Sequence, residues 1–306
     1  MRNASVATLT LVCAALGLHV TAQAQQNRQN LSPEERARQQ AEAERRLQEE
    51  LRAPRAIEAL NSIWIEELTW MEVRDAIAAG KTIAIVPTGG VEQNGPYVAL
   101  GKHNYVLQGA CEALARRLGN ALCAPIVKFV PEGNYDPPTG HMRYPGTISV
   151  RGETFEALLD DIGTSLKVHG FEHIIYIGDS GGNQTGMANV AKRQNERWGR
   201  PIAHHIPQFY NYPDVEHYME TALGVKETSD DGFHDDYYIT ALMMTVDPTV
   251  VRYDQRVQAG KATINGLSIA PKERTIEIGK KLMDFRVDVT VKAIQAALAG
   301  AASSRP

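Results

Sequence analysis

The chain has 306 residues, of which 43% are hydrophobic and 22% are charged, with 25 glycines and 15 prolines. This composition excludes a disordered, collagen-like or coiled-coil protein and is typical of one or two globular domains. A formal net charge of −4, with no basic cluster interleaved with aromatic residues, indicates that nucleic acid is not a partner. The three cysteines are too few for a disulfide scaffold, and none has metal-binding spacing.

The first 24 residues have the features of a secretory signal peptide. Arg2 precedes an apolar run from Val6 to Leu18, and small residues stand at the positions that signal peptidase reads. The run is shorter than the ~20 apolar residues that span a bilayer, which argues against the alternative of a retained membrane anchor. We expect cleavage after Ala24 and a mature protein in the periplasm or secreted, with no membrane anchor.

Residues 25–56 form a polar segment ahead of a globular domain that we expect over residues 57–306. Ser32 as N-cap, Pro33 at the first helical position and Glu35 two residues later predict a helix start. Alternating charges at four-residue spacing then favour a solvated helix. The segment is either a docking or oligomerisation arm or, as we favour, a mobile polar linker helix.

The globular part alternates amphipathic helices with short apolar runs. We expect strands over 82–87, 122–130 and 173–177, and helices over 70–79, 104–118, 153–169, 184–198 and 273–298. Residues 223–236 have the composition of a loop. The βαβα order implies an α/β fold, a three-layer sandwich around a mainly parallel β-sheet, with its functional loops at the carboxyl ends of the strands.

Two cysteines remain once the signal peptide is removed. Cys111 falls on an expected helix, and Cys123 lies at the start of an expected strand. Pairing is open to them in an oxidising compartment. We favour two buried free thiols, because small buried cysteines commonly pack as apolar residues.

Three polar loops each come after a segment interpreted as a buried strand. In a parallel sheet their rims face the same edge, so that Glu92, His103, Asp179 and His234 converge there. Carboxylate and imidazole groups form a ligand set suited to Zn²⁺ or Mn²⁺. Each residue also has a purely structural interpretation, such as a turn carboxylate for Glu92, an acceptor of backbone N–H groups for Asp179 or a surface position for His103.

Several strings in these loops resemble the signatures of the creatininase (creatinine amidohydrolase) family. Residues 87–101 read PTGGVEQNGPYVALG and resemble "P-x-G-S-x-E-Q-H-G-P-H-L-P-L". Residues 141–149 resemble "H-x-x-F-P-G-T-x-S", residues 178–183 stand where the family has "N-G-H-G-G-N", and residues 232–241 where it has "G-x-H-A-G-E-x-E-T-S". The resemblance implies a hydrolase of cyclic or linear amide C–N bonds on an α/β sandwich, a homo-oligomer, and two divalent metals that activate a water.

The sequence departs from the family pattern at the metal ligands. Only Glu92 is identical, and the other ligand positions hold Asn94, His103, Ser180 beside Asp179, and Tyr237. Because His103 lacks the charge of a bridging carboxylate, we expect one divalent metal rather than two. The predicted ligands are Glu92, His103 and Asp179, with Zn²⁺ preferred over Mn²⁺.

We expect water activated by this metal to attack the carbonyl of a small amide, lactam or lactone. His234, which matches a histidine of the resemblance, is the predicted proton shuttle, and Asp235 or Asp236 either orients it or adds a ligand. The amides of Gly181 and Gly182 are candidates for stabilising an oxyanion. The predicted pocket residues are Asn94, His141, Tyr144, Asn183 and Tyr237, with Tyr238 as a further aromatic candidate.

Two alternatives stay open. The string GDSGG at 178–182 also surrounds the nucleophile of chymotrypsin-like proteases, which would make Ser180 a catalytic nucleophile, but the all-β context of those proteases is missing. Activation of Ser180 by His234 in another type of enzyme is a variant of this idea. The second alternative is a non-catalytic periplasmic protein that binds a small molecule on a degenerate creatininase fold.

Overall fold

The computed structural model describes residues 32–303 of a chain that divides into two units, Met1–Glu58 and Ala59–Pro306. In the first unit, α2 (Pro33–Arg52) begins with the predicted capping box: the Glu35 amide donates to Ser32 Oγ, and the Ser32 amide donates to the Glu35 carboxylate. None of its residues is buried. The predicted helix is confirmed, whereas the predicted signal peptide lies outside the described residues and stays a prediction.

The second unit is built on a four-stranded parallel sheet in the order β2-β1-β3-β4. Its strands are β1 (Ile83–Thr88), β2 (Ala121–Cys123), β3 (His173–Gly178) and β4 (Ala203–His205). Along β1, Ile83 and Ile85 belong to one apolar cluster, and Ala84 and Val86 belong to the other. The sheet is therefore buried on both faces, as parallel sheets are.

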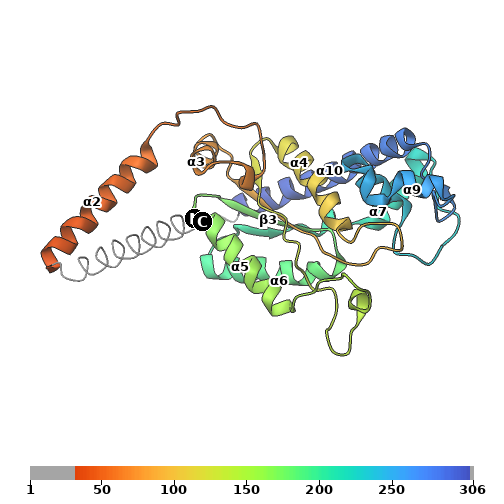
Figure 1. Cartoon of the computed structure of the whole chain (residues 1–306). Helices are drawn as coiled ribbons and strands as arrows, with labels where there is room; N and C mark the ends of the chain where they lie inside the picture. Colours follow the sequence, from red (N-terminus) through yellow and green to blue (C-terminus); the bar gives the residue numbers. More distant parts are fainter. Residues whose placement is uncertain (1–31, 304–306) are drawn as a thin grey trace, which may run out of the picture. The chain divides into compact units, whose positions relative to one another are not determined.

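Helices cover both faces of this sheet and make the predicted three-layer α/β sandwich. Figure 1 shows α5 and α6 on one face and α4 and α10 on the opposite face. The bounds are α3 (Trp70–Ala78), α4 (Lys102–Leu118), α5 (Gly152–Val168), α6 (Gln184–Trp198), α7 (Tyr212–Leu223), α8 (Tyr237–Val246), α9 (Tyr253–Gln258) and α10 (Lys272–Ser303), with an antiparallel pair, β5 (Thr263–Ile264) and β6 (Leu267–Ser268). No helix within residues 32–303 combines the length and the apolar character needed to cross a membrane.

The central strands β1 and β3 create a crevice at their carboxyl ends. Thr88 and Gly178, the last residues of the two strands, lie side by side in the sheet. The chain leaves β1 toward α4 on one face and leaves β3 toward α6 on the other face. Ligands of open α/β sheets bind where such connections diverge, so the two loops frame the expected binding crevice.

The second strand is shorter than the predicted strand over 122–130. β2 ends at Cys123, and Pro125 follows without the N–H that a continuing ladder would need. Beyond the proline, Val127 and Val130 make only isolated bridges, to Thr88 and Ser149. The loop that carries the chain across the carboxyl edge of the sheet therefore begins earlier than the sequence indicates.

The third polar loop does not follow a strand, contrary to the sequence interpretation. Residues 224–236 carry no helix or strand, as predicted, but they connect α7 to α8. Helix α8 was missed because eight of its ten residues are buried, which leaves no polar face to give a helical period. His234 still reaches the crevice, from the loop just before α8.

The two cysteines of the described chain form a disulfide, so the expectation of free thiols is wrong. Cys111 lies on α4 and Cys123 ends β2, with their Cα atoms 6.5 Å apart. Both side chains are fully buried. The two sulfurs meet because α4 packs directly on the edge strand β2, a contact that the sequence alone did not predict.

A half-buried histidine pair between β3 and β4 makes the folding stability depend on pH. His204 Nε2 lies 3.3 Å from His173 Nδ1, and burial together with the His173 charge lowers the pKa of His204 to about 4. Between pH 6.5 and 4 the unfolded chain binds this proton and the folded chain does not, so stability falls as the pH falls. We predict that His204→Gln flattens this part of the urea-unfolding profile, while His217→Gln on the surface leaves it unchanged; an unaltered slope in His204→Gln would contradict the assignment.

Candidate active site

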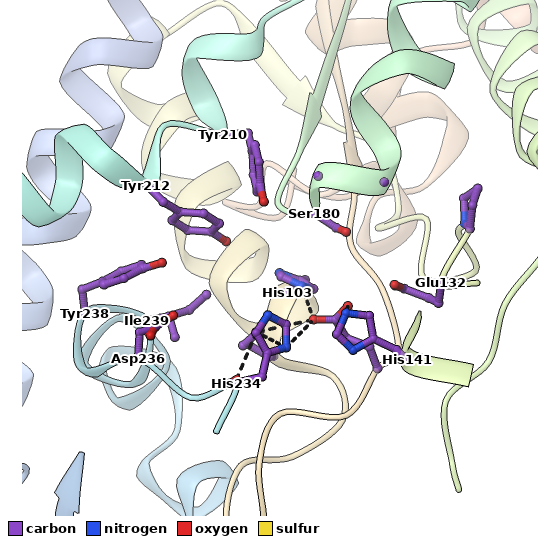
Figure 2. A pocket seen from close by; sticks show the side chains of 15 residues that line it. His103, Glu132, His141, Ser180, Tyr210, Tyr212, His234, Asp236, Tyr238 and Ile239 are labelled. Atoms are coloured by element: carbon purple, nitrogen blue, oxygen red, sulfur yellow. Dashed lines mark hydrogen bonds and ion pairs between the residues drawn. The ribbon is translucent and has the colours of Figure 1, made fainter. Parts of the chain in front are cut away.

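A polar pocket of about 450 Å³ opens at the carboxyl edge of the sheet. Residues from the loops after all four strands line it, among them Glu92, His141, Ser180 and Tyr210. The loop before α8 and the start of α8 add His234, Asp236, Tyr238 and Ile239. Figure 2 shows the labelled side chains among them, such as His141, Tyr210 and His234, around a common space. The prediction that loops far apart in sequence converge at one edge is confirmed for this pocket.

Glu92, His103 and Asp179 form a continuous buried array, which we call the buried triad. His103 Nε2 lies 2.8 Å from Glu92 Oε1, and His103 Nδ1 lies 2.8 Å from Asp179 Oδ2. A neutral imidazole has only one N–H, so carboxylates on both nitrogens require the doubly protonated ring. Burial lowers the pKa of His103, but the hydrogen bonds to Asp179 and Glu92 outweigh burial and raise it above its ordinary value.

The structure thus brings together the three residues predicted to bind a metal, but in a form that closes His103 to a metal. Both ring nitrogens of His103 face carboxylates and neither offers a lone pair to an ion. The second oxygen of Asp179 is held by the Arg286 guanidinium, which also donates to the carbonyl of Phe209. Burial would raise the pKa of Asp179, but Arg286 and His103 outweigh it and lower the pKa.

Glu92 is the centre of the site because four side chains with basic nitrogens surround it. Besides His103, Lys102 Nζ lies 3.4 Å and His234 Nδ1 3.5 Å from Oε1, and His141 Nε2 lies 3.2 Å from Oε2. Burial would raise the pKa of Glu92, but the hydrogen bond from His103 and the neighbouring charges outweigh it and lower the pKa. Glu92 is therefore an anion at neutral pH despite its burial.

A second group of residues has its possible metal-ligand atoms close together at the pocket. Glu92, His141 and His234, which we call the pocket triad, have ligand atoms that all lie within 4.8 Å of one another. The two imidazole rings stack, with centroids 4.9 Å apart, and His141 Nδ1 is buried without a hydrogen-bond partner. His234 Nδ1 lies 3.2 Å from the carbonyl oxygen of Gln93, which fits an N–H at that position and a lone pair on Nε2.

Glu132, from the loop after β2, was missed by sequence reasoning. Its side chain lines the pocket, and burial together with the Glu92 charge raises its pKa to about 9. The carboxyl group therefore keeps its proton at neutral pH and shares it in a hydrogen bond with Glu92. The only signal for Glu132 in the sequence was its place soon after an apolar run. No motif includes it, and the predicted strand ended at Val130, two residues before it.

Three tyrosines form one wall of the pocket. Tyr210 lies just before α7, Tyr212 is the first residue of α7, and Tyr238 comes from α8. Adjacent rings have centroids 4.8 Å and 5.3 Å apart. The Tyr212 hydroxyl donates to the Asp179 carbonyl, which ties the wall to the end of β3. Tyr210 and Tyr212 were missed because α7 was not predicted, whereas Tyr238 was among the aromatic candidates.

Of the residues predicted to catalyse, Ser180, His234 and Asp236 all line the pocket. Ser180 leads into the turn Gly181–Asn183 ahead of α6, and its side chain is drawn beside the pocket in Figure 2. Asp235 is directed away, because its carboxylate is buried 3.6 Å from Arg256. Asp235 therefore pairs with an arginine instead of orienting His234.

Four of the five predicted pocket residues take other places, and only His141 lines the polar pocket. Asn94 is buried, and its Nδ2 donates to the carbonyls of Glu92 and Ala99. Asn183 Nδ2 donates to Thr88 and Gly89, which ties the loops after β1 and β3 together. Tyr237 is a core residue near Thr275, and Tyr144 lines a neighbouring hollow of about 610 Å³ that also contacts His234.

A comparison with protein families decides the assignment. The family model named Creatininase, described as creatinine amidohydrolase, matches residues 66–294. The chain belongs to the creatininase family. The motifs at 87–101 and 178–183 predicted this family, and the match confirms the resemblance.

Individual creatininases agree with this placement. Creatinine amidohydrolase of Pseudomonas putida is 24% identical over 219 residues, which cover 69% of this chain and 82% of that protein. Two solved structures, titled "Creatininase Mn" and a mutant creatininase of "Zn-Zn type", have TM-scores of 0.55 and 0.53. Each is 22% identical, covering 80% and 81% of this chain and 100% of the other, so their likeness establishes the creatininase fold.

Proposed function

We propose that this protein hydrolyses a C–N bond of a small amide or lactam in the polar pocket, with one divalent ion held by Glu92, His141 and His234. The observation that carries the proposal is the pocket triad, whose ligand atoms lie within 4.8 Å of one another at the carboxyl edge of a creatininase fold. The description of the family as creatinine amidohydrolase supports amide hydrolysis, and the Mn and Zn-Zn titles of two relatives support a divalent metal.

The donor set suits zinc in particular. Two imidazoles and one carboxylate form the ligand set of several catalytic zinc hydrolases, which leave a fourth position open. Manganese accepts the same groups and is the second choice. Of the ligands expected from sequence, we keep Glu92 and replace His103 and Asp179 with His141 and His234. The nitrogens of His103 and the carboxylate oxygens of Asp179 are already engaged in the buried triad and with Arg286.

When bound, the ion supplies Lewis-acid chemistry, lowering the pKa of water and polarising a carbonyl oxygen. Residues of the protein would supply proton transfer and stabilisation of the developing oxyanion. Glu132, protonated at neutral pH with a pKa of about 9, is placed in the pocket to give a proton to a leaving amine. The turn at Gly181 and Gly182 lines the same pocket and offers backbone amides ahead of α6 for a developing oxyanion.

We also propose that the protein works outside the cytoplasm, in the periplasm or after secretion. The signal-peptide features of residues 1–24 are the basis for this, and the Cys111–Cys123 disulfide supports it, because disulfides persist in oxidising compartments. Environmental amides, lactams and lactones are the substrates that such a location favours. A homo-oligomer is part of the same proposal.

Metal analysis together with a substrate panel tests the proposed function. We expect about one Zn²⁺ or Mn²⁺ per chain after dialysis, and hydrolysis of at least one amide or lactam that a chelator stops and added metal restores. His141→Ala should lower both metal content and rate, whereas His217→Ala on the surface should change neither. Tight binding of a small molecule by a metal-free protein without turnover would instead establish the non-catalytic binding protein.

A further inference from the structure

Lys102 is a buried cation inside the candidate active site that no motif indicated. It is the first residue of α4, and only 2% of its surface is exposed. Its Nζ lies 3.4 Å from Glu92 Oε1, 3.4 Å from each ring nitrogen of His234 and 3.4 Å from the His234 carbonyl oxygen. Burial lowers the pKa of Lys102 against the opposing effect of the Glu92, Asp179 and Asp236 charges, and its Nζ contacts two members of the pocket triad.

The two oxygens of Glu92 have different surroundings because of this lysine. Oε1 faces Lys102, His103 and His234, at distances of 2.8 to 3.5 Å. Oε2 faces His141 Nε2 at 3.2 Å. Positive charge is thus gathered on the Oε1 side, and a divalent ion would meet electrostatic repulsion there. The Oε2 side, next to His141, remains the better place for an ion.

Asp179, the carboxylate next to the end of β3, has no free oxygen with which to anchor a second ion. Asp179 is fully buried and has Arg286 on Oδ1 and His103 on Oδ2. Asn94, close to Glu92 in the same loop, uses its amide nitrogen to hold two backbone carbonyls. The protein's own cations therefore balance both carboxylates before any metal binds.

We propose that Lys102 is a built-in cation of this site, which confines a divalent ion to the His141 side of Glu92 and limits the centre to one ion. The inference rests on the proposed function, since it assumes that the pocket triad holds metal. In this role Lys102 is a positioning residue, because it acts on the ion through Glu92 and His234. Its charge weakens metal affinity, so a neutral residue of similar shape should strengthen it.

Manganese binding by the purified full chain tests this inference. Titration with Mn²⁺, followed by the electron paramagnetic resonance of the free ion, should give one ion per chain in the wild type. We expect Lys102→Met to bind the first ion at least tenfold more tightly, and Lys102→Arg, which keeps the charge, to stay within about threefold of the wild type. Lys128→Met, at an exposed lysine, is the matched control and should bind as the wild type does.

The possible outcomes separate this inference from the proposed function. Two ions per chain in the wild type, a result that needs no variant to fold, would overturn the inference and leave the hydrolase proposal standing. Unchanged or weaker Mn²⁺ binding by a folded Lys102→Met would overturn it as well. If the wild type binds no ion, the proposed metal dependence fails, and the inference fails with it whether or not Lys102→Met gains an ion.

Discussion

Replacing Glu92 with glutamine should remove metal binding and hydrolysis together. Glu92 is the sole carboxylate of the pocket triad and contacts both of its histidines, at 3.2 and 3.5 Å. Glutamine keeps the shape of the side chain but loses its charge and turns one acceptor into a donor. We expect the fall in rate to exceed the roughly 10–100-fold loss that follows removal of a residue supporting a metal ligand. Metal content and initial rates on a hydrolysed amide measure this.

The same substitution has a second consequence within the buried triad. His103 would keep Asp179 but face an amide where Glu92 stood, so one reason for its double protonation would disappear. Thermal unfolding of the variant should therefore be recorded beside its metal content. Glu153→Gln, at an exposed carboxylate paired with Arg151 near the start of α5, provides the control and should keep both metal and rate. A folded Glu92→Gln protein that retained them would refute the ligand assignment.

The fold was predictable where the sequence is periodic or punctuated. The apolar runs of β1 and β3, each followed by a glycine-rich turn, predicted their strands, and Ser32 marked the start of α2. Helix α8 was not predicted, because it is buried on nearly every side and its sequence shows no amphipathic period. The second strand was predicted too long because its run is apolar apart from Lys128, and Pro125 interrupts the strand within that run.

The candidate site was predictable to the level of which loops meet. Parallel strands end at one edge, so residues that follow β1 and β3 had to approach each other, and Glu92 and Asp179 do. The sequence could not predict the orientation of the side chains or the hydrogen bonds that they make. Whether His103 offers a lone pair to an ion or two protons to carboxylates depends on side-chain geometry alone. The partner of Asp179 is equally out of reach, because Arg286 lies 107 residues further along the chain.

Replacing Arg286 with methionine should greatly lower the free energy of unfolding. The guanidinium is 2% exposed, binds the Asp179 carboxylate and the Phe209 carbonyl, and stacks 4.2 Å from the Phe209 ring centroid. Methionine fills much of the same volume but leaves a fully buried carboxylate with only His103 as a charged partner. Removing one member of a buried ion pair costs about 3–5 kcal/mol, which for a chain of this size lowers Tm by on the order of 10 °C.

An exposed arginine gives a matched control for this effect. Arg117 on α4 pairs with Asp284 and Asp288 of α10, but its side chain is 40% exposed, so Arg117→Met should cost no more than about 1 kcal/mol. Adding Asp179→Asn to Arg286→Met should recover part of the loss, because the stranded charge is then removed. Urea unfolding of the four proteins, the wild type, both single arginine variants and the double variant, measures these differences. Equal losses of unfolding free energy for the two arginine variants would mean that Arg286 does not hold Asp179 in its ionised form. The argument that the buried triad cannot bind a metal would then fail, because it depends on that ion pair.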